Sequence, residues 1–192
     1  MTPYTLIVAA TKESGIGIKG GLPWRIPKDM VFFKHVTTLI PKTSPQHLQN
    51  VVIMGRVTWE SIPPKFRPLT DRFNIVISRN PLYDLQDAPN TVLADSFEKA
   101  LSLVDPKLHG RVFVVGGAHM YQLAIKERHC SHILLTRINS DIECDTFFPN
   151  IDEKDFRLAN HQELEEYVEQ VVPSGKQSHK DIDYEFLLYI RK

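Results

Sequence analysis

Short, almost continuous runs of apolar residues recur along the chain, and glycine, proline or polar clusters close them. Runs of this length, rich in valine, isoleucine and phenylalanine, are typical of strands that are buried on both faces of a sheet. The pattern predicts strands over Tyr4–Ala10, Asn50–Met54, Phe73–Ser78, Thr91–Ala94, Arg111–Val115 and His132–Ile138. Two more strands are expected over Phe156–His161 and Tyr184–Ile190, separated by an acidic stretch and a polar loop over residues 173–183.

Segments with helical spacing of apolar residues alternate with these strands. Helices are predicted over Lys28–Thr38, Arg56–Ile62 and His119–Lys126, and a further helix is predicted to begin at Ser96. Alternation of strands and helices favours an α/β fold with a central, mostly parallel twisted sheet and flanking helices. Because no helical pattern separates the last two strands, we expect an antiparallel hairpin at the C-terminal edge of the sheet. No repeat or linker divides the chain, so residues 1–192 are expected to form a single domain.

Composition narrows the classes of function. The 23 basic residues equal the 23 acidic residues, so no overall basic field would attract nucleic acid or an anionic membrane. Cys130 and Cys144 and the eight histidines show no metal-ligand spacing, and the two thiols fit a reducing compartment. The first residues carry no basic region, and their apolar run is too short to span a bilayer. We therefore expect a cytoplasmic protein with no metal, membrane or nucleic-acid partner.

The Gly15–Thr37 stretch combines features that a ligand pocket requires. Its glycines allow backbone conformations closed to other residues, so the segment can approach a ligand closely and can move. Pro23 then stiffens the exit and Trp24 supplies a large amphipathic surface. On the helix that follows, Asp29 shares a face with Phe33. A carboxylate beside an aromatic ring can hold a flat polar ring, although the helix dipole alone also favours an acid in a first turn.

Three predicted strands end in glycine, serine or arginine, in the runs Gly55-Arg56-Val57-Thr58, Ser78-Arg79 and Gly116-Gly117. Ligands of open α/β sheets bind at the carboxyl ends of strands, and a helix that starts there offers free N–H groups to phosphate. This arrangement favours a dinucleotide site, and the two arginines favour a 2′-phosphate and hence NADPH over NADH. No G-x-G-x-x-G fingerprint is present. Taken singly, each arginine is more typical of a solvated surface charge, and a tight turn explains the diglycine as well as a ligand contact does.

Arg72 directly precedes a predicted strand and can clamp a carboxylate through two parallel hydrogen bonds. From its residue type alone, Arg72 is better interpreted as an ordinary surface arginine. Trp59, Phe147 and Phe148 are interpreted as aromatics of the core or of its edge.

Taken in order, these motifs resemble the dihydrofolate reductase family over nearly the whole chain. The resemblance rests on Gly17, Leu22-Pro23-Trp24, Asp29, Phe33, Thr37, the run from Val52 to Trp59, Ser61-Ile62-Pro63, Val115-Gly116-Gly117, Tyr121, Thr136 and the run from Asp145 to Pro149. It implies hydride transfer from NADPH to C6 of 7,8-dihydrofolate with protonation at N5, which supplies tetrahydrofolate to one-carbon metabolism. It also implies binding of antifolate inhibitors and a monomer, and the length and insertions resemble eukaryotic, fungal-type members.

The resemblance assigns roles residue by residue. Asp29 and Thr136 would hold the pterin ring in an apolar pocket, and Leu22 and Trp24 belong to the loop that closes over the site. Substrate contacts are implied for Ile7, Val8, Ala9, Met30, Phe33, Thr58, Ser61, Ile62, Pro63, Phe66, Leu69, Arg72, Val115 and Tyr121. Cofactor contacts are implied for Ala9, Ile16, Gly17, Gly20, Gly21, Leu22, Gly55, Arg56, Val57, Thr58, Ser78, Arg79, Val115, Gly116, Gly117, Ala118, His119, Met120 and Tyr121.

Three further expectations concern chemistry. Arg72 would bind the glutamate α-carboxylate of the substrate, and Arg79 the 2′-phosphate of the cofactor. Burial should raise the pKa of Asp29, whereas a bound cation-like pterin should lower it. Water is the expected proton donor to N5, because the family pattern has no acidic side chain beside that atom.

Two positions depart from the family pattern. Asp29 stands where vertebrate-like members carry glutamate, and Met30 stands where a branched or aromatic residue is frequent, which affects antifolate selectivity more than the reaction. A related pyrimidine-pathway reductase of the same fold is one alternative, which the Pro-Trp-acid motif and Arg72 argue against. A binding module without catalysis is the other, and the intact Leu22 and Asp29 argue against it. Absorbance at 340 nm with NADPH and dihydrofolate separates the three readings.

Overall fold

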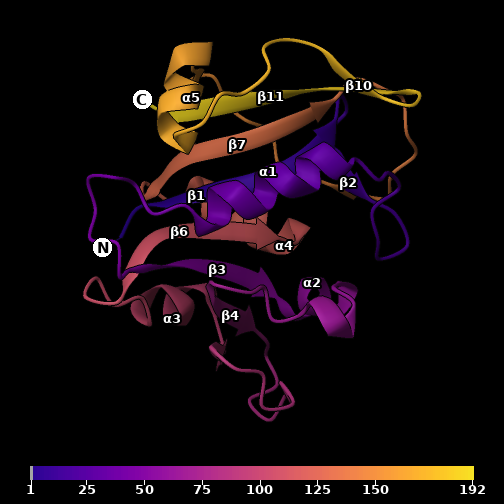
Figure 1. Ribbon diagram of the computed structural model, residues 1–192. Helices are drawn as coiled ribbons and strands as arrows, with labels where there is room; N and C mark the ends of the chain where they lie inside the picture. The colour runs from indigo at the N-terminus through magenta and orange to yellow at the C-terminus, as the bar shows by residue number, and fades with distance from the viewer. Residues whose placement is uncertain (1) are drawn as a thin grey trace.

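The computed structural model describes residues 2–192, and a central sheet of nine strands organises them (Figure 1). Along the sheet the order is β10-β11-β7-β1-β6-β3-β4-β5, and β9 also pairs with β11. The strands are β1 (Tyr4–Thr11), β3 (Gln49–Gly55), β4 (Phe73–Ile77), β5 (Thr91–Ala94), β6 (His109–Gly116), β7 (Cys130–Ile138), β9 (Phe156–Leu158), β10 (Gln177–His179) and β11 (Ile182–Arg191). The neighbours from β7 to β5 are parallel, and β11 is antiparallel to β7, β9 and β10. The expected mostly parallel α/β sheet is confirmed.

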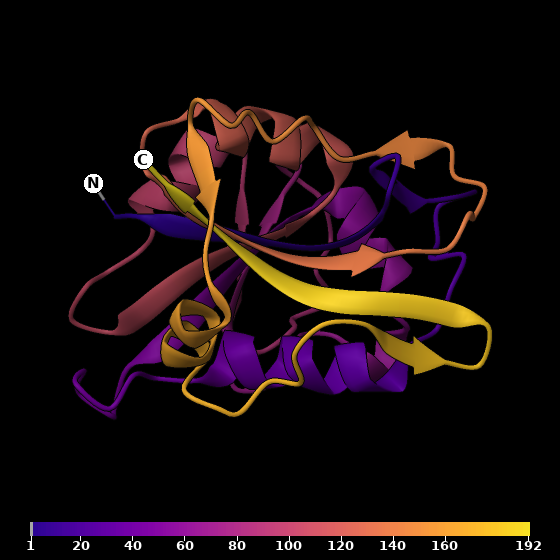
Figure 2. The ribbon, with the colours of Figure 1, turned by 90° about the horizontal axis from the view of Figure 1, so that it is seen from above.

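Helices cover both faces of this sheet, with α1 and α5 on one side and α3 and α4 on the other (Figure 2). The helices are α1 (Pro27–Thr38), α2 (Arg56–Ser61), α3 (Phe97–Ser102), α4 (Ala118–Lys126) and α5 (His161–Val168), together with a 3₁₀ turn, η1 (Pro64–Phe66). Pro27 opens α1, where a missing N–H has no cost, and Asp29 lies in its first turn. The Ser96 side chain caps α3 by accepting a hydrogen bond from the Lys99 N–H at 3.0 Å.

Two hydrophobic cores result, one on each face of the sheet. The core beneath α3 and α4 includes Phe97 and Ala124, and the core beneath α1, α2 and α5 includes Val36, Trp59 and Val168. Strands buried on both faces explain why the sequence shows continuous apolar runs and no clear alternation. No helix within residues 2–192 combines the length and the apolar character that crossing a bilayer requires.

The region after β9 differs from the prediction. Helix α5 lies between β9 and β11, so the expectation that no helix separates the last two strands was wrong. Asn160 and Glu163 form a reciprocal capping box at its start, and this signal was present in the sequence. The antiparallel C-terminal hairpin does exist, but its first strand is β10, which lies within the stretch predicted as a polar loop. The predicted strand over Phe156–His161 ends at Leu158, and His161 belongs to the helix.

A second, two-stranded antiparallel sheet was also missed. It consists of β2 (Gly15–Gly17) and β8 (Thr146–Phe147), and it ties the glycine-rich segment to a stretch about 130 residues later. Of the three predicted core aromatics, Trp59 and Phe148 are buried. Phe147 is 48% exposed on β8 and marks the edge of the core.

Candidate active site

The carboxylate of Asp29 lies at the start of α1, opposite the end of β7. The Thr136 hydroxyl on β7 donates a hydrogen bond of 2.6 Å to Oδ1 of Asp29. Desolvation raises the pKa of Asp29, and the hydrogen bond from Thr136 partly opposes this shift. No side chain within residues 2–192 donates a hydrogen bond to the other oxygen, Oδ2. Asp29 therefore keeps one fixed oxygen and one oxygen that can accept from a ligand.

Strand β1 forms the floor beside this carboxylate. Ala9 pairs with Thr136 in the β1–β7 register, and Ile7 and Ala9 contribute side chains to the same core as Trp24 and Val36. Val8 contributes its side chain to the opposite core, so only its backbone faces the site. Three residues for which substrate contacts were predicted, Ile7, Val8 and Ala9, thus lie on the strand beside Asp29. Val8 can contact a ligand there only through its main chain.

The end of β6 approaches the same place from the other side. Gly116 has a φ of 136°, and a Cβ atom there would lie 3.1 Å from Oγ1 of Thr58. A Cβ atom on Gly117 would meet the same hydroxyl at 3.2 Å. The hydroxyl of Tyr121, on α4, donates to the carbonyl oxygen of Ile7 at 2.7 Å and so links α4 to β1. Close packing and backbone conformation both explain why two glycines follow Val115.

The strand ends predicted to bind phosphate lie along one edge of the sheet, but their side chains differ in availability. Arg56 forms an exposed ion pair of 2.8 Å with Glu60, one turn further along α2. The buried Ser78 hydroxyl accepts a hydrogen bond of 3.1 Å from the Asn80 N–H. Arg79 is exposed and makes no side-chain hydrogen bond within residues 2–192. Val57 and His119 are exposed, whereas Met120, on α4, is buried.

The glycine-rich segment is a compact turn held at both ends. The Ile18 and Gly21 backbones exchange two hydrogen bonds of 2.9 Å, and Gly20 adopts a φ of 78° between them. The carboxylate of Asp145, just before β8, accepts from the Lys19 N–H at 3.0 Å. After the turn, Leu22 is 67% exposed and Trp24 is buried at 7%. Trp24 is therefore fixed in the core beside the site, while Leu22 is free to meet a ligand.

The residues predicted to surround the substrate tail form an open wall of half-buried and exposed side chains beyond Asp29. Ile62, Leu69 and Phe33 are half-buried, and Met30, Ser61, Pro63 and Phe66 are exposed. Arg67 supports this wall by donating from Nη1 to the carbonyl oxygens of Trp59, Glu60 and Ile62 at 3.2, 3.3 and 2.8 Å. Met30 also lines a shallow, mainly apolar hollow along α1 together with Val31 and Lys34.

Arg72 lies at the far end of this wall and is buried, with 4% of its surface exposed. Its Nε donates to the Thr70 carbonyl oxygen at 2.8 Å, and its Nη1 donates to the Thr37 hydroxyl at 3.0 Å. Burial lowers the pKa of this guanidinium. Sequence analysis assigned Thr37 no contact role, although its place on the same helix face as Asp29 was a usable signal. No cluster of three metal-ligating side chains occurs among residues 2–192.

Comparison with known proteins identifies the family. The family model described as dihydrofolate reductase matches residues 4–180. A dihydrofolate reductase of Pneumocystis carinii is 40% identical over 97% of this chain and 96% of the relative, and that of Candida albicans is 41% identical over the same shares. The solved structure of Schistosoma mansoni dihydrofolate reductase superposes with a TM-score of 0.81 at 33% identity, covering 100% of this chain and 99% of that chain. The chain belongs to the dihydrofolate reductase family.

Proposed function

We propose that this protein reduces 7,8-dihydrofolate to 5,6,7,8-tetrahydrofolate with NADPH as the reductant, by hydride transfer to C6 and protonation at N5. The observation that carries the proposal is the 2.6 Å hydrogen bond between Thr136 and Asp29 in a desolvated pocket at the carboxyl ends of the strands. Membership of the family supports the reaction class, in which a nicotinamide cofactor and a small-molecule substrate take part.

On this proposal Asp29 orients the substrate. With Oδ1 held by Thr136, Oδ2 accepts from the pterin amino group and ring N–H, which aligns the ring against β1. The negative charge also favours protonation of N5. Water delivers this proton, because the family pattern has no acidic side chain beside N5. The buried Arg72 binds the glutamate α-carboxylate, and its fixed Nη1 leaves the remaining guanidinium edge for that contact.

The residues at the strand ends fit a dinucleotide. A Cβ atom on Gly20 or Gly21 would meet no other atom within 4 Å, so this backbone turn leaves space beside it. The start of α4, after Gly117, offers free N–H groups to a pyrophosphate, and the exposed Arg79 offers its guanidinium to a 2′-phosphate. NADPH, when bound, supplies the hydride. Leu22 and the turn around Gly20 exclude water from the reacting rings.

The remaining parts of the proposal follow the family. Residues 1–192 act as a single domain and a monomer, located in the cytoplasm, and antifolates that mimic the pterin compete for Asp29. The fungal relatives support a fungal-type enzyme.

Oxidation of NADPH at 340 nm in the presence of dihydrofolate tests the reaction, and Asp29→Asn tests the site. This substitution keeps the size of the side chain and removes its charge, so hydride transfer at neutral pH should fall by a factor on the order of 10² to 10⁴. The rate should recover towards pH 5, where solvent supplies protonated substrate. Asp87→Asn, at an exposed loop position, is the matched control. Wild-type rates at pH 7.5 in single-turnover measurements of Asp29→Asn would assign the acid a purely structural role.

Cofactor choice is tested separately with Arg79→Ala. Loss of a charged hydrogen bond to the 2′-phosphate should raise the Michaelis constant for NADPH by about 10- to 100-fold, equivalent to roughly 1.5–3 kcal/mol. The constant for NADH should change little, because NADH lacks that phosphate. Arg128→Ala, which removes an exposed arginine after α4, serves as the control. An equal change with both cofactors would remove Arg79 from the phosphate site.

A further inference from the structure

The two arginines that sequence analysis assigned to the cofactor follow neighbouring parallel strands, β3 and β4. Gly55 at the end of β3 pairs with Ile77 at the end of β4. Arg56 comes directly after Gly55, and Arg79 follows Ile77 by two residues. The carboxyl ends of parallel strands meet at one edge of the sheet, so both arginines start from the same level of that edge.

Glu60, in the last turn of α2, holds Arg56 in place. Nη1 of Arg56 lies 2.8 Å from Oε1 of Glu60, one helical turn further on. The other guanidinium nitrogens of Arg56 make no hydrogen bond within residues 2–192. An exposed ion pair of this kind adds little to stability. Its effect is to restrict the orientation of the arginine while the remaining N–H groups stay available to a ligand.

The second oxygen of the Glu60 carboxylate is bound as well. The Tyr83 hydroxyl donates a hydrogen bond of 2.7 Å to Oε2. This hydrogen bond lowers the pKa of Glu60, desolvation partly opposes the shift, and Arg56 lowers the pKa further. Glu60 is therefore ionised at neutral pH, and it joins side chains from two different segments of the chain.

A short turn connects Tyr83 to Arg79. The Tyr83 N–H donates to the carbonyl oxygen of Asn80, the residue after Arg79, at 3.1 Å. The Asn80 N–H donates to the Ser78 hydroxyl, also at 3.1 Å. The turn is thus fixed to the end of β4. The contact between Glu60 and Tyr83 therefore ties this turn, and Arg79 with it, to α2.

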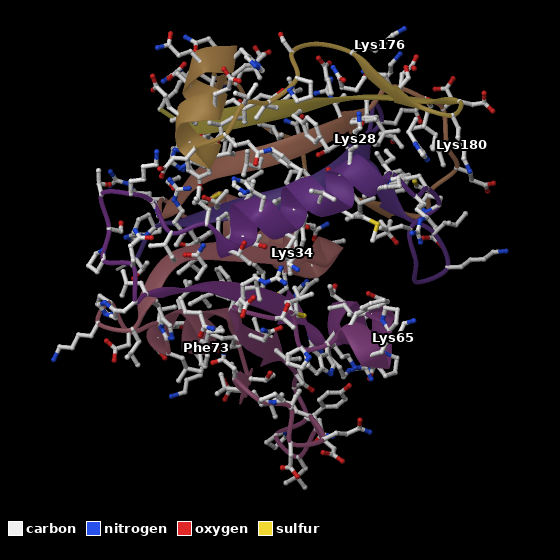
Figure 3. All side chains as sticks on the ribbon, in the orientation of Figure 1. Lys28, Lys34, Lys65, Phe73, Lys176 and Lys180 are labelled. Carbon is white, nitrogen blue, oxygen red and sulfur yellow. The ribbon has the colours of Figure 1, made fainter. Side chains whose placement is uncertain are left out.

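The other cations beside α2 have different partners. Lys65, which Figure 3 shows next to α2, places its ammonium group 4.9 Å from the centroid of the neighbouring aromatic ring. Arg67 donates to three main-chain carbonyl oxygens at the end of α2. Within residues 2–192 the ion pair of Glu60 is therefore with Arg56, and Arg79 forms none.

We propose that Glu60 and Tyr83 are positioning residues for the 2′-phosphate of the cofactor, because together they hold Arg56 and Arg79 at one edge of the sheet. Two guanidinium groups outweigh one carboxylate, so Glu60 orients Arg56 without cancelling the attraction to phosphate. A side chain that is already ordered loses less conformational freedom on binding, which strengthens the complex. The inference rests on the proposed function, because it takes NADPH to be the ligand of these strand ends.

Direct binding of NADPH and NADH, followed by quenching of tryptophan fluorescence, tests this inference without turnover. In Glu60→Ala the dissociation constant for NADPH should rise by about 3- to 10-fold, the range expected when one side chain must be ordered on binding. The constant for NADH should change much less, because NADH lacks the 2′-phosphate. Tyr83→Phe keeps the ring and loses only the contact with Glu60, so it should give a smaller change of the same kind. Glu98→Ala, at an exposed position on α3, is the control and should leave both constants unchanged.

Two further variants test whether Glu60 acts through Arg56. Glu60→Gln can keep both contacts through its amide group, so its constant for NADPH should lie nearer to the wild-type value than that of Glu60→Ala. In an Arg56→Ala background, Glu60→Ala should cost less than it does in the wild type, because one of the two arginines that it positions is absent.

Three results would overturn the inference. Tighter binding of NADPH by Glu60→Ala would mean that Glu60 only repels phosphate, and an equal loss for NADPH and NADH would mean that it only supports the fold. An undiminished effect of Glu60→Ala in the Arg56→Ala background would show that Glu60 does not act through Arg56. A wild-type protein that binds neither cofactor, or that does not reduce dihydrofolate, would instead overturn the proposed function.

Discussion

Arg72 is a charged side chain buried in the fold without an ion pair within residues 2–192, and its partners are a backbone carbonyl oxygen and the Thr37 hydroxyl. Burial of a guanidinium without a counter-charge is costly, which is reflected in the lowered pKa of this residue. Such a residue is best explained by an anion that completes its environment. The Asp29 carboxylate shows the complementary case, with a raised pKa that a cation-like ring would lower.

At this scale, Arg72→Leu should separate two classes of antifolate. Methotrexate carries a glutamate carboxylate and should lose affinity by about 10- to 100-fold, the range expected for a charged hydrogen bond of roughly 1.5–3 kcal/mol. A small diaminopyrimidine without this carboxylate should bind almost as in the wild type. Thr37→Val, which frees Nη1 of Arg72 but keeps the charge, should give a smaller loss for methotrexate. Equal losses for both ligands in fluorescence titrations would mean that Arg72 supports the fold only.

Among the elements, α5 shows how local chemistry defines a helix in an acidic stretch. The Asn160 side chain accepts from the Glu163 N–H at 2.9 Å, and Glu163 accepts in return from the Asn160 N–H at 3.1 Å. Arg157 of β9 adds two hydrogen bonds to the same carboxylate at 3.0 and 2.7 Å. These contacts lower the pKa of Glu163 to about 2. The helix is thus joined to the strand that precedes it.

Removal of this cap should destabilise the protein measurably. Asn160→Ala is expected to lower the free energy of unfolding by about 1 kcal/mol, because the N–H of Glu163 loses its partner. Gln162→Ala, an exposed position in the same first turn, should change it by less than about 0.5 kcal/mol. Urea titrations at pH 7 measure both values. A cost for Gln162→Ala as large as that for Asn160→Ala would show that helix propensity, and not the cap, determines the effect.

For the whole molecule, the packing of α5 against the sheet creates a polar cluster remote from the site. The ring of His132 on β7 lies against the ring of Tyr167 on α5, with centroids 4.7 Å apart. The guanidinium of Arg111 lies over the same Tyr167 ring, 4.1 Å from its centroid. The Tyr167 hydroxyl and the Thr5 hydroxyl share a hydrogen bond of 2.6 Å. Burial and then the charge of Arg111 lower the pKa of His132 to about 4. The folded state therefore favours the neutral form of His132.

This shift predicts a pH dependence of stability. The folded pKa of about 4 lies below the ordinary histidine value of 6.5, so the unfolded chain binds more protons between these two values. His132 should therefore destabilise the fold progressively as pH falls through this window, by about 1–2 kcal/mol after allowance for its partial exposure. His132→Phe should reduce the loss of stability between pH 7 and pH 4.5, whereas His47→Gln, an exposed position, should not. Parallel pH profiles from urea unfolding of wild type and His132→Phe would contradict this.

The chain alone was sufficient for several parts of the fold and the site. Continuous apolar runs predicted β1, β3, β4, β6 and β7, because strands buried on both faces require them. Strands β5 and β11 were also predicted, although fewer of their residues are fully buried. The order of glycine turn, Pro-Trp, acid and aromatic was sufficient to indicate the family. The roles of these residues depend on local backbone conformation and on helical spacing, and both can be read from the sequence. The short strands β2, β8 and β10 were missed, since two or three residues carry no periodicity.

Tertiary structure decided which of these groups meet. Thr136 reaches Asp29 across 107 positions, and Arg72 reaches Thr37 across 35. It also determined that Arg72 is buried and that Arg56 is paired with Glu60. Local sequence encodes backbone preference and burial, whereas pairing between distant residues depends on strand register and helix docking. Those are set by the packing of the whole chain.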